Sequence, residues 1–188
     1  AGRGLVEPQD TVPSERILTI NRKGEIIAAK EPLHFYEPSR TGLDCGLSFG
    51  KELIKRIPQD ISVIIIPAAV GGSSVSQWLG DSIYRNVQLL TNFREKVEIG
   101  KKYGQIKGIL WHQGETDATQ NRIPIYKNRL SQLFEKFRAI SGNENLPILI
   151  GELGSYSTNN ESWMKINEQI RLYVFTDRNA MVVKTSDL

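Results

Sequence analysis

The stretch Ile109-Leu110-Trp111-His112-Gln113-Gly114-Glu115-Thr116-Asp117 begins as an apolar run and ends in a dense polar cluster. An apolar run closed by glycine is typical of a buried strand followed by a tight turn. The turn carries an imidazole, a carboxamide and two carboxylates, at the position where a parallel sheet presents side chains to a ligand. A polar turn with no ligand would have the same composition, and the stretch alone leaves both interpretations open.

Apolar strands and amphipathic helices alternate on both sides of this stretch. The segment Ser62–Pro67 is β-branched at nearly every position, which suits a strand that is covered on both faces of a parallel sheet. The alternation predicts an α/β fold, a three-layer α/β/α sandwich with a mostly parallel sheet of the flavodoxin-like type. We expect a hairpin over 16–28, strands over 62–67, 106–111, 147–151 and 181–184, and helices over 44–57, 81–102, 125–140 and 163–175.

Four of the predicted strands are each followed by a small or polar loop. These loops have the sequences GGSS (71–74), HQGETD (112–117), ELGS (152–155) and TSD (185–187). Right-handed crossovers place such loops at one edge of a parallel sheet, the carboxyl ends of the strands. The topology therefore predicts one crevice lined by Gly71, Gly72, Gln113, Glu115 and Glu152.

Length and composition describe an ordinary soluble globular protein. The chain has 188 residues, of which 39% are hydrophobic and 24% charged, and its net charge is +3. We expect a single domain over residues 1–188. Lysine and arginine are scattered and no apolar run is long enough to span a bilayer, so we expect neither a nucleic-acid partner nor membrane insertion. Oligomeric state, and a cytoplasmic or secreted location, are left open.

The sequence indicates no metal site and no cofactor. It contains two histidines, His34 and His112, and neither has the spacing of a zinc motif. His34 stands in an irregular loop over 30–43, where a packing or surface role is the more common one. The single cysteine, Cys45, excludes an intramolecular disulfide. It stands at a predicted helix start, which favours a thiolate, although a small buried residue is the preferred interpretation.

The loop residues suit the stabilisation of negative charge on an ester carbonyl. Two glycines let backbone N–H groups approach a ligand oxygen, and the Gln113 carboxamide donates without a change of protonation. Donors of both kinds aimed at one point form an oxyanion hole. Alternatively, Gly71 and Gly72 form a tight strand-to-helix turn, and Gln113 closes its own turn through a hydrogen bond.

Two motifs also resemble those of a known family. The sequence WHQGETD at 111–117 is similar to the HQGE signature of the sialate O-acetylesterase and carbohydrate esterase family 6 group, a branch of the SGNH hydrolases. The block Gly71-Gly72-Ser73-Ser74 followed by Trp78 matches the family's GGSS-x-x-x-W pattern. The resemblance covers most of residues 1–188. It implies an SGNH-type domain that binds and deacetylates acetylated carbohydrate, such as sialic acid or xylan.

The resemblance also implies roles for individual residues. The N–H of Gly71 or Gly72 and the Gln113 side chain belong to the oxyanion hole. Glu115 supports the catalytic histidine or the loop, and His112 orders the loop. His112 and Ser73 are predicted substrate-binding residues. Trp78 and Trp111 are expected in the core rather than as a platform for sugar.

The chain departs from the family pattern at both ends. The nucleophilic serine of the family stands in a GQSN block just before an AGRG-like segment, and this chain begins with AGRG at 1–4. The catalytic base stands in a D-x-x-H block after the last strand, and the chain stops at Asp187-Leu188. Either the sequence is a trimmed form that lacks its first strand and its C-terminal segment, or it is a catalytically inactive relative. We favour trimming, because loss of a central strand would leave apolar faces and strand edges uncovered.

Three other functions remain as alternatives. An inactive homologue would bind carbohydrate without turnover. Ser73 or Ser74 would be an internal nucleophile if His112 lay within hydrogen-bond reach, but the segment does not match the nucleophile elbow. Retaining glycosidase chemistry would need Glu115 and Glu152 about 5 Å apart.

Overall fold

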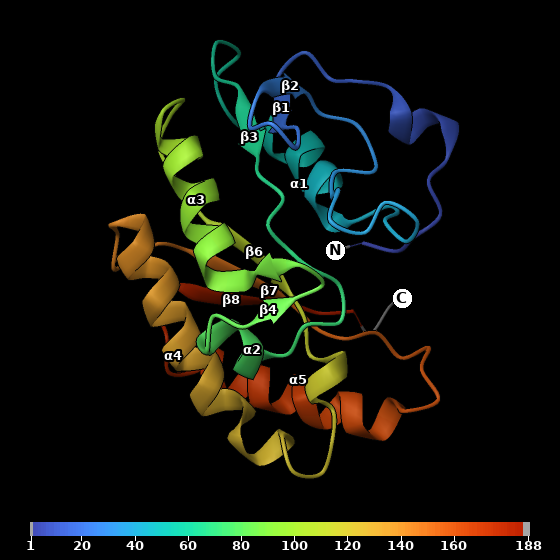
Figure 1. The fold of residues 1–188 in the computed structure, drawn as a ribbon, viewed down its shortest axis with the longest axis vertical. Coiled ribbons are helices and arrows are strands. Elements are labelled where there is room, and N and C mark those ends of the chain that lie inside the picture. The colour runs from blue at the N-terminus through green and yellow to red at the C-terminus, as the bar shows by residue number, and fades with distance from the viewer. Residues whose placement is uncertain (1, 186–188) are drawn as a thin grey trace. The chain divides into compact units, whose positions relative to one another are not determined.

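The structure of the protein is a computed structural model, and it describes residues 2–185 (Figure 1). Strands and helices alternate along most of the chain, and the α/β class with mostly parallel strands is confirmed. The last residues of the predicted TSD loop, from 186 on, and Ala1 lie outside the described residues. The strands are β1 (Ile17–Ile20), β2 (Ile26–Ala28), β3 (Val63–Ile65), β4 (Ile83–Tyr84), β5 (Val87–Gln88), β6 (Ile109–His112), β7 (Ile148–Gly151) and β8 (Ala180–Val183). The α-helices are α1 (Cys45–Leu53), α2 (Val75–Leu79), α3 (Leu89–Lys101), α4 (Ile123–Ser141) and α5 (Asn160–Val174), and short 3-10 helices cover Pro8–Thr11 and Glu115–Asp117.

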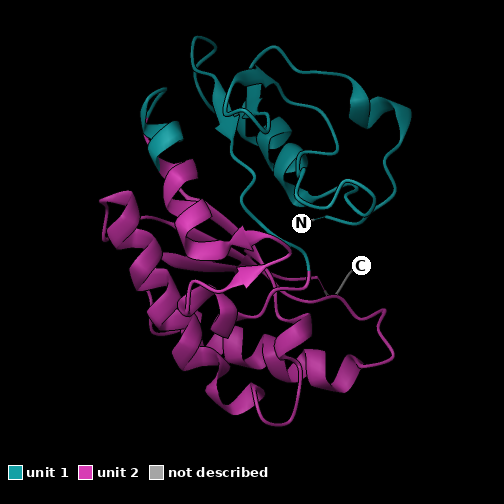
Figure 2. Ribbon diagram, viewed as in Figure 1, with its two compact units in different colours: residues 1–71, 98–104 teal, residues 72–97, 105–188 magenta. Residues whose placement is uncertain are grey.

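The chain divides into two compact units, which Figure 2 distinguishes by colour. Unit 1 comprises residues 1–71 and 98–104, and unit 2 comprises residues 72–97 and 105–188. The prediction of one domain over residues 1–188 stays a prediction. We describe each unit by itself.

Unit 1 contains the predicted hairpin and the first parallel strand pair. Strand β1 pairs with β2 antiparallel and with β3 parallel, in the order β2-β1-β3. Helix α1 packs against β1 and β3. The core of the unit includes Ile17, Ala29, Leu33 and Leu47, all of them buried.

Helix α1 begins at Cys45 as the sequence predicts, but the cysteine itself is exposed, so its predicted burial is wrong. The side chain of Asp44 caps the helix by accepting a hydrogen bond from Gly46 N–H. Desolvation of the sulfur, followed by the negative charge of Asp44, raises the pKa of the thiol. A helix N-terminus alone therefore does not make this cysteine a ready nucleophile.

The loop before α1 contains a buried carboxyl group. Glu31 is 2% exposed; its Oε2 accepts a hydrogen bond from Leu33 N–H, whereas its Oε1 has no partner among the described residues. Burial, followed by the charge of Asp44, raises the pKa of Glu31 from 4.5 to about 7. His34 lies nearby with its Nδ1 2.5 Å from Asp44 Oδ2, an internal contact rather than a ligand contact.

This raised pKa predicts a pH-dependent stability. The folded state keeps the Glu31 proton up to about pH 7, whereas the unfolded chain loses it near pH 4.5. Ionisation of Glu31 therefore lowers the free energy of unfolding of the wild type as the pH rises from about 4.5 to about 7. In Glu31→Gln we expect the free energy of unfolding to exceed that of the wild type by on the order of 2 kcal/mol at about pH 8, and to match it more closely at about pH 5. Urea unfolding at both pH values measures the difference. The exposed Glu15→Gln is the control, and an equal effect of Glu31→Gln at both pH values would contradict the prediction.

Unit 2 contains the second parallel sheet, in the order β6-β7-β8. The strands are in register, with Ile109 opposite Ile148 and Ile148 opposite Ala180, so their carboxyl ends lie at one edge. Helices α4 and α5 pack against each other, and α5 packs against β8. Trp78 and Trp111 are buried and meet edge to face with ring centroids 5.7 Å apart, which confirms their predicted core position.

The predicted helix over 81–102 is wrong in its first part. Residues 83–88 form the antiparallel hairpin β4–β5, and α3 begins only at Leu89. Asp81, Arg85 and Asn86 have positive φ angles of 50°, 49° and 62°, which no α-helix allows. Ile83 and Val87, whose spacing also fits a helix, lie in this strand pair, and Ile83 is exposed.

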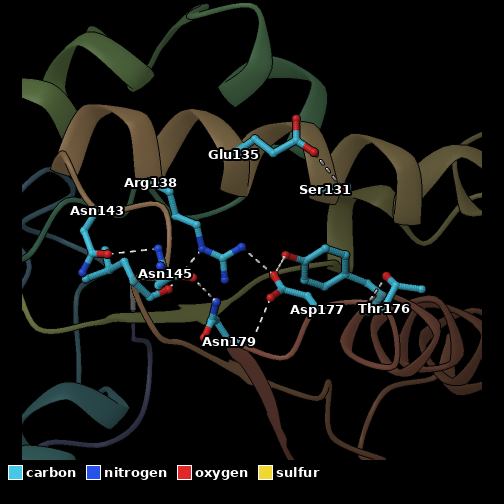
Figure 3. Close-up of polar contacts among 10 residues, drawn as sticks. Ser131, Glu135, Arg138, Asn143, Asn145, Thr176, Asp177 and Asn179 are labelled. Atoms are coloured by element: carbon cyan, nitrogen blue, oxygen red, sulfur yellow. Dashed lines mark hydrogen bonds and ion pairs between the residues drawn. The ribbon is translucent and has the colours of Figure 1, made fainter.

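A polar network ties α4 to the segment between α5 and β8 (Figure 3). Arg138 donates from Nη1 to Asp177 Oδ2 at 2.6 Å and from Nε to the carbonyl of Leu146 at 3.1 Å. Tyr173 donates its hydroxyl to the same Asp177 oxygen. Burial acts to raise the pKa of Asp177, but the hydrogen bonds from Arg138 and Tyr173 outweigh it and hold that pKa below its ordinary value. The network therefore stabilises the unit above the acid range and weakens as pH falls.

No helix in the described part of the chain combines the length and the apolar character needed to cross a bilayer.

Candidate active site

The predicted polar loops of unit 2 meet at the carboxyl edge of its sheet. His112 ends β6, and its Nε2 lies 3.2 Å from the carbonyl oxygen of Glu152 in the next loop. Thr185 donates its hydroxyl to the carbonyl of Leu153 at 3.0 Å. Three loops that are far apart in the sequence are thus hydrogen-bonded neighbours, as parallel topology predicts.

The Gln113 carboxamide is buried and held in one orientation. Its Oε1 faces the Tyr126 hydroxyl at 3.2 Å, and its Nε2 donates to the carbonyl of Ser73 at 3.1 Å and to Asp117 Oδ2 at 2.6 Å. The last two partners are acceptors only, so the amide nitrogen must face them. Burial, followed by the charge of Asp117, raises the pKa of Tyr126, which keeps its proton as a donor. The side chain thus links the HQGETD and GGSS loops.

Asp117 is the residue of this site that the sequence did not single out. It is 2% exposed, and its Oδ2 accepts from both Gln113 Nε2 and the N–H of Val75, the first residue of α2, at 2.9 Å. One carboxylate oxygen therefore fixes the catalytic candidate Gln113 and the end of the GGSS loop together. In the sequence, Asp117 looks like one more polar turn residue, because nothing there reveals its burial.

Close packing against helix α5 explains the glycine in the HQGETD loop. Gly114 has φ +155°, and a Cβ at this position would lie 2.6 Å from Ile166 Cγ2 of α5. Only glycine lets the loop approach the helix this closely.

The two glycines of the GGSS loop differ in what their N–H groups face. In unit 1, the N–H of Gly71 donates to Glu37 Oε2 at 2.8 Å, and Arg3 pairs with the other oxygen of that carboxylate at 3.1 Å. In unit 2, Gly72 is exposed with φ +84°, and its carbonyl accepts a hydrogen bond from Thr116 Oγ1 at 2.9 Å. Within residues 2–185, the N–H of Gly72 donates to no group. Gly72 is therefore the glycine whose N–H is open to a ligand.

The two serines of this loop are engaged inside the protein. Ser73 is 3% exposed, and its Oγ accepts from the indole N–H of Trp78 at 2.9 Å. Ser74 caps α2 and forms a capping box with Gln77. Both hydroxyl groups thus form hydrogen bonds within the protein, which disfavours either serine as an internal nucleophile. The substrate-binding role predicted for Ser73 stays a prediction.

The two glutamates lie in different surroundings. Glu115 is exposed, and its Oε2 accepts from Gly114 N–H at 3.0 Å, a contact within the loop. Glu152 is 3% exposed and accepts from Arg171 Nε at 2.6 Å. Glu152 is therefore held in an ion pair with Arg171, whereas Glu115 stays within its own loop.

The site offers one backbone donor, the N–H of Gly72, that is open to an oxygen ligand. Gly72 directly precedes Ser73, whose carbonyl accepts a hydrogen bond from the Gln113 amide. No group of three or more metal-ligating side chains with metal-site geometry occurs among the described residues.

Comparison with known proteins finds a matching family model and a similar curated protein. A family model described as carbohydrate esterase, sialic acid-specific acetylesterase matches residues 1–188. A curated relative, the probable carbohydrate esterase At4g34215 of Arabidopsis thaliana, is 30% identical over 149 residues, which are 76% of this chain. The chain spans 55% of the length of that relative.

Solved structures show the same fold. The structure of the Arabidopsis thaliana protein AT4G34215 superposes with a TM-score of 0.80 at 24% identity, covering 96% of this chain and 72% of that one. NanS gives 0.69 at 16% identity, with 100% and 74% covered. XAC1771 of Xanthomonas citri, described as a novel carbohydrate acetylesterase, gives 0.65 at 18% identity, with 95% and 45% covered.

Proposed function

Because the chain belongs to the sialic acid-specific acetylesterase family of carbohydrate esterases, we propose that its protein is a serine-type O-acetylesterase. The substrate is an acetylated carbohydrate, such as acetylated sialic acid or acetylated xylan. The nucleophilic serine and its histidine base are expected outside residues 1–188, whose two histidines, His34 and His112, are both engaged in internal contacts.

One observation carries the proposal: the N–H of Gly72 is open, and it lies beside the loop that the Gln113 carboxamide contacts. When a serine attacks the acetyl carbonyl, negative charge develops on the carbonyl oxygen. A backbone N–H and an amide N–H stabilise that charge without reorganising solvent. Gly72 is the preferred backbone donor over Gly71, whose N–H already binds Glu37.

Gln113 donates in the transition state by exchanging a partner. Both of its amide hydrogens face protein acceptors, at 2.6 Å from Asp117 and 3.1 Å from the carbonyl of Ser73. The longer bond to the neutral carbonyl is the weaker one, and an oxyanion competes for that hydrogen. The charge-assisted bond to Asp117 remains and keeps the amide in place.

Acetate release from O-acetylated sialic acid and from acetylated xylan by the full-length protein tests the proposal. An esterase releases acetate from at least one of them with turnover. The competing function, an inactive carbohydrate-binding homologue, predicts sugar binding by calorimetry with no acetate above the uncatalysed rate, and that result would overturn the proposal.

A further inference from the structure

An exposed aromatic ring stands on the loop that joins β7 to α5, drawn in orange in Figure 1. The ring belongs to Tyr156, which is 79% exposed. A single exposed aromatic residue is common on protein surfaces and indicates no function by itself. The Tyr156 ring differs from such a residue because two neighbours restrain it.

The first neighbour is the ring of Trp163 in the first turn of α5. The two ring centroids lie 5.4 Å apart with their planes at 90°, an edge contact that restrains the tyrosine. Trp163 is partly buried, so it is a firm support. Its indole N–H donates to no group within residues 2–185 and is available to a ligand.

The second neighbour is the backbone at Gly154. A Cβ built there would lie 2.6 Å and 2.8 Å from two carbons of the Tyr156 ring, so the ring occupies the space that a side chain would fill. Gly154 has no positive φ, so its backbone conformation does not require glycine. The missing side chain therefore makes room for the ring. A restrained aromatic ring that stays exposed binds a ligand at a low cost in side-chain entropy.

The surroundings of the ring are polar but uncharged. Residues 153–160, LGSYSTNN, include hydroxyl and amide side chains and no charged residue. The flanking carboxylates are paired, Glu152 with Arg171 and Glu161 with Lys165, each at 2.6 Å. An aromatic surface among neutral hydrogen-bonding groups suits a neutral sugar ring, whose C–H groups pack on the aromatic ring while its hydroxyls form hydrogen bonds.

This loop is joined to the HQGETD loop of the candidate active site. Asn159 Nδ2 donates to the carbonyl of Ala118, directly after HQGETD, at 3.3 Å. The HQGETD loop in turn contacts the GGSS loop, because the Thr116 hydroxyl donates to the carbonyl of Gly72 at 2.9 Å. In this order of contacts HQGETD lies between Gly72 and Tyr156, so we expect a ligand that reaches both to have more than one sugar ring.

We propose that Tyr156 and Trp163 bind a neutral sugar ring linked to the acetylated sugar, so that the protein prefers an acetylated oligosaccharide to a single acetylated sugar. The inference rests on the proposed esterase function, which places the acetyl group at Gly72 and Gln113. Tyr156 supplies the contact surface, and the indole N–H of Trp163 donates to a sugar hydroxyl. Both residues determine specificity and take no part in the attack on the acetyl group.

The test compares the methyl glycoside of an acetylated sugar with the same acetylated sugar linked to neutral sugars. Two such pairs cover the substrates proposed above: O-acetylated sialic acid alone and linked to lactose, and acetylated xylose alone and within xylotriose. In the pair that is turned over by the full-length wild type, we expect kcat/KM to be roughly tenfold or more higher for the oligosaccharide. Equal values of kcat/KM in that pair would overturn the inference.

Substitutions at Tyr156 separate the ring from its hydroxyl. Tyr156→Ala should remove most of the preference for the oligosaccharide, whereas Tyr156→Phe keeps the ring and should retain it. Phe175→Ala is the matched control. Phe175 is 91% exposed at the end of α5 and contacts no other aromatic ring within residues 2–185, so this variant should keep the preference.

Gly154→Ala tests the support of the ring without removing it. The new methyl group would displace the Tyr156 ring, which can move at little cost because it is exposed. We expect the preference to fall several-fold, and melting temperatures check that each variant is folded. An unchanged preference for the oligosaccharide in both Gly154→Ala and Tyr156→Ala would overturn the inference.

A binding experiment keeps the inference separable from the esterase function. Calorimetry with unacetylated sialyllactose and xylotriose, each compared with the methyl glycoside of its single sugar, needs no turnover. Tighter binding of an oligosaccharide that disappears in Tyr156→Ala supports the inference even if no acetate is released, which would then refute only the esterase function. Equal binding within both pairs by the wild type, alongside measurable acetate release, refutes the inference and leaves the esterase function intact.

Discussion

Replacement of Asp117 by alanine is expected to lower the free energy of unfolding by about 3 kcal/mol. The carboxylate is buried, and its loss leaves one amide hydrogen of Gln113 and the N–H of Val75 without an acceptor. If the full-length protein has the proposed esterase activity, displacement of the freed Gln113 side chain should also reduce kcat by roughly a hundredfold, because a small misplacement of a transition-state donor is costly. Urea unfolding and acetate release measure the two effects.

Glu115→Ala is the matched control for this experiment. The two carboxylates stand two residues apart in the same loop, but Glu115 is exposed and contacts only Gly114 within it. We expect its removal to change stability by less than about 1 kcal/mol. Equal effects of the two substitutions would show that Asp117 does not have the positioning role described above.

Replacement of Gln113 by alanine is expected to lower kcat by on the order of a hundredfold or more while KM changes little. The amide hydrogen that stabilises the oxyanion acts in the transition state and adds little to binding of the ground state. Steady-state kinetics on an acetylated sugar measure kcat and KM separately. An unchanged kcat would remove Gln113 from the oxyanion hole.

Two further variants control for structural damage in Gln113→Ala. Tyr126→Phe removes the hydroxyl that holds Gln113 Oε1 and its backbone carbonyl but leaves both amide hydrogens. It should cost stability with a much smaller loss of kcat. Gln132→Ala removes an exposed carboxamide on α4 and should be neutral in both measurements. A loss of kcat in Tyr126→Phe as large as in Gln113→Ala would mean that packing, rather than the amide donor, determines the rate.

The strands and most helices follow from the sequence for simple physical reasons. The β-branched run at 62–67 and the apolar runs ending at Trp111 and Gly151 were predicted as strands, and β3, β6 and β7 lie there. The sequence did not predict the hairpin β4–β5. Its turn needs positive φ at Arg85 and Asn86, and it lacks the glycine that usually marks such a turn. At these two residues the surrounding structure imposes a backbone conformation that their local propensity disfavours.

The candidate site was predictable as a meeting of loops but not in its hydrogen bonds. Parallel topology brings the HQGETD and ELGS loops to one edge of the sheet, regardless of the side chains they carry. The contact between the His112 ring and the Glu152 carbonyl shows that the two loops are neighbours. By contrast, the central position of Asp117 depends on its burial, and the difference between Gly71 and Gly72 depends on Glu37, which is distant in the sequence. Composition within a motif carries no information about such partners.

A crystal structure of the full-length protein after reaction with a phosphonate ester of the acyl-transfer type tests the oxyanion assignment most directly. The phosphonyl oxygen mimics the charged tetrahedral intermediate. We expect it about 2.7–3.1 Å from both Gly72 N and Gln113 Nε2, with the Gln113 bond to the Ser73 carbonyl lengthened and the bond to Asp117 kept. A phosphonyl oxygen held by other donors, with Gln113 still bound to both Ser73 and Asp117, would contradict it.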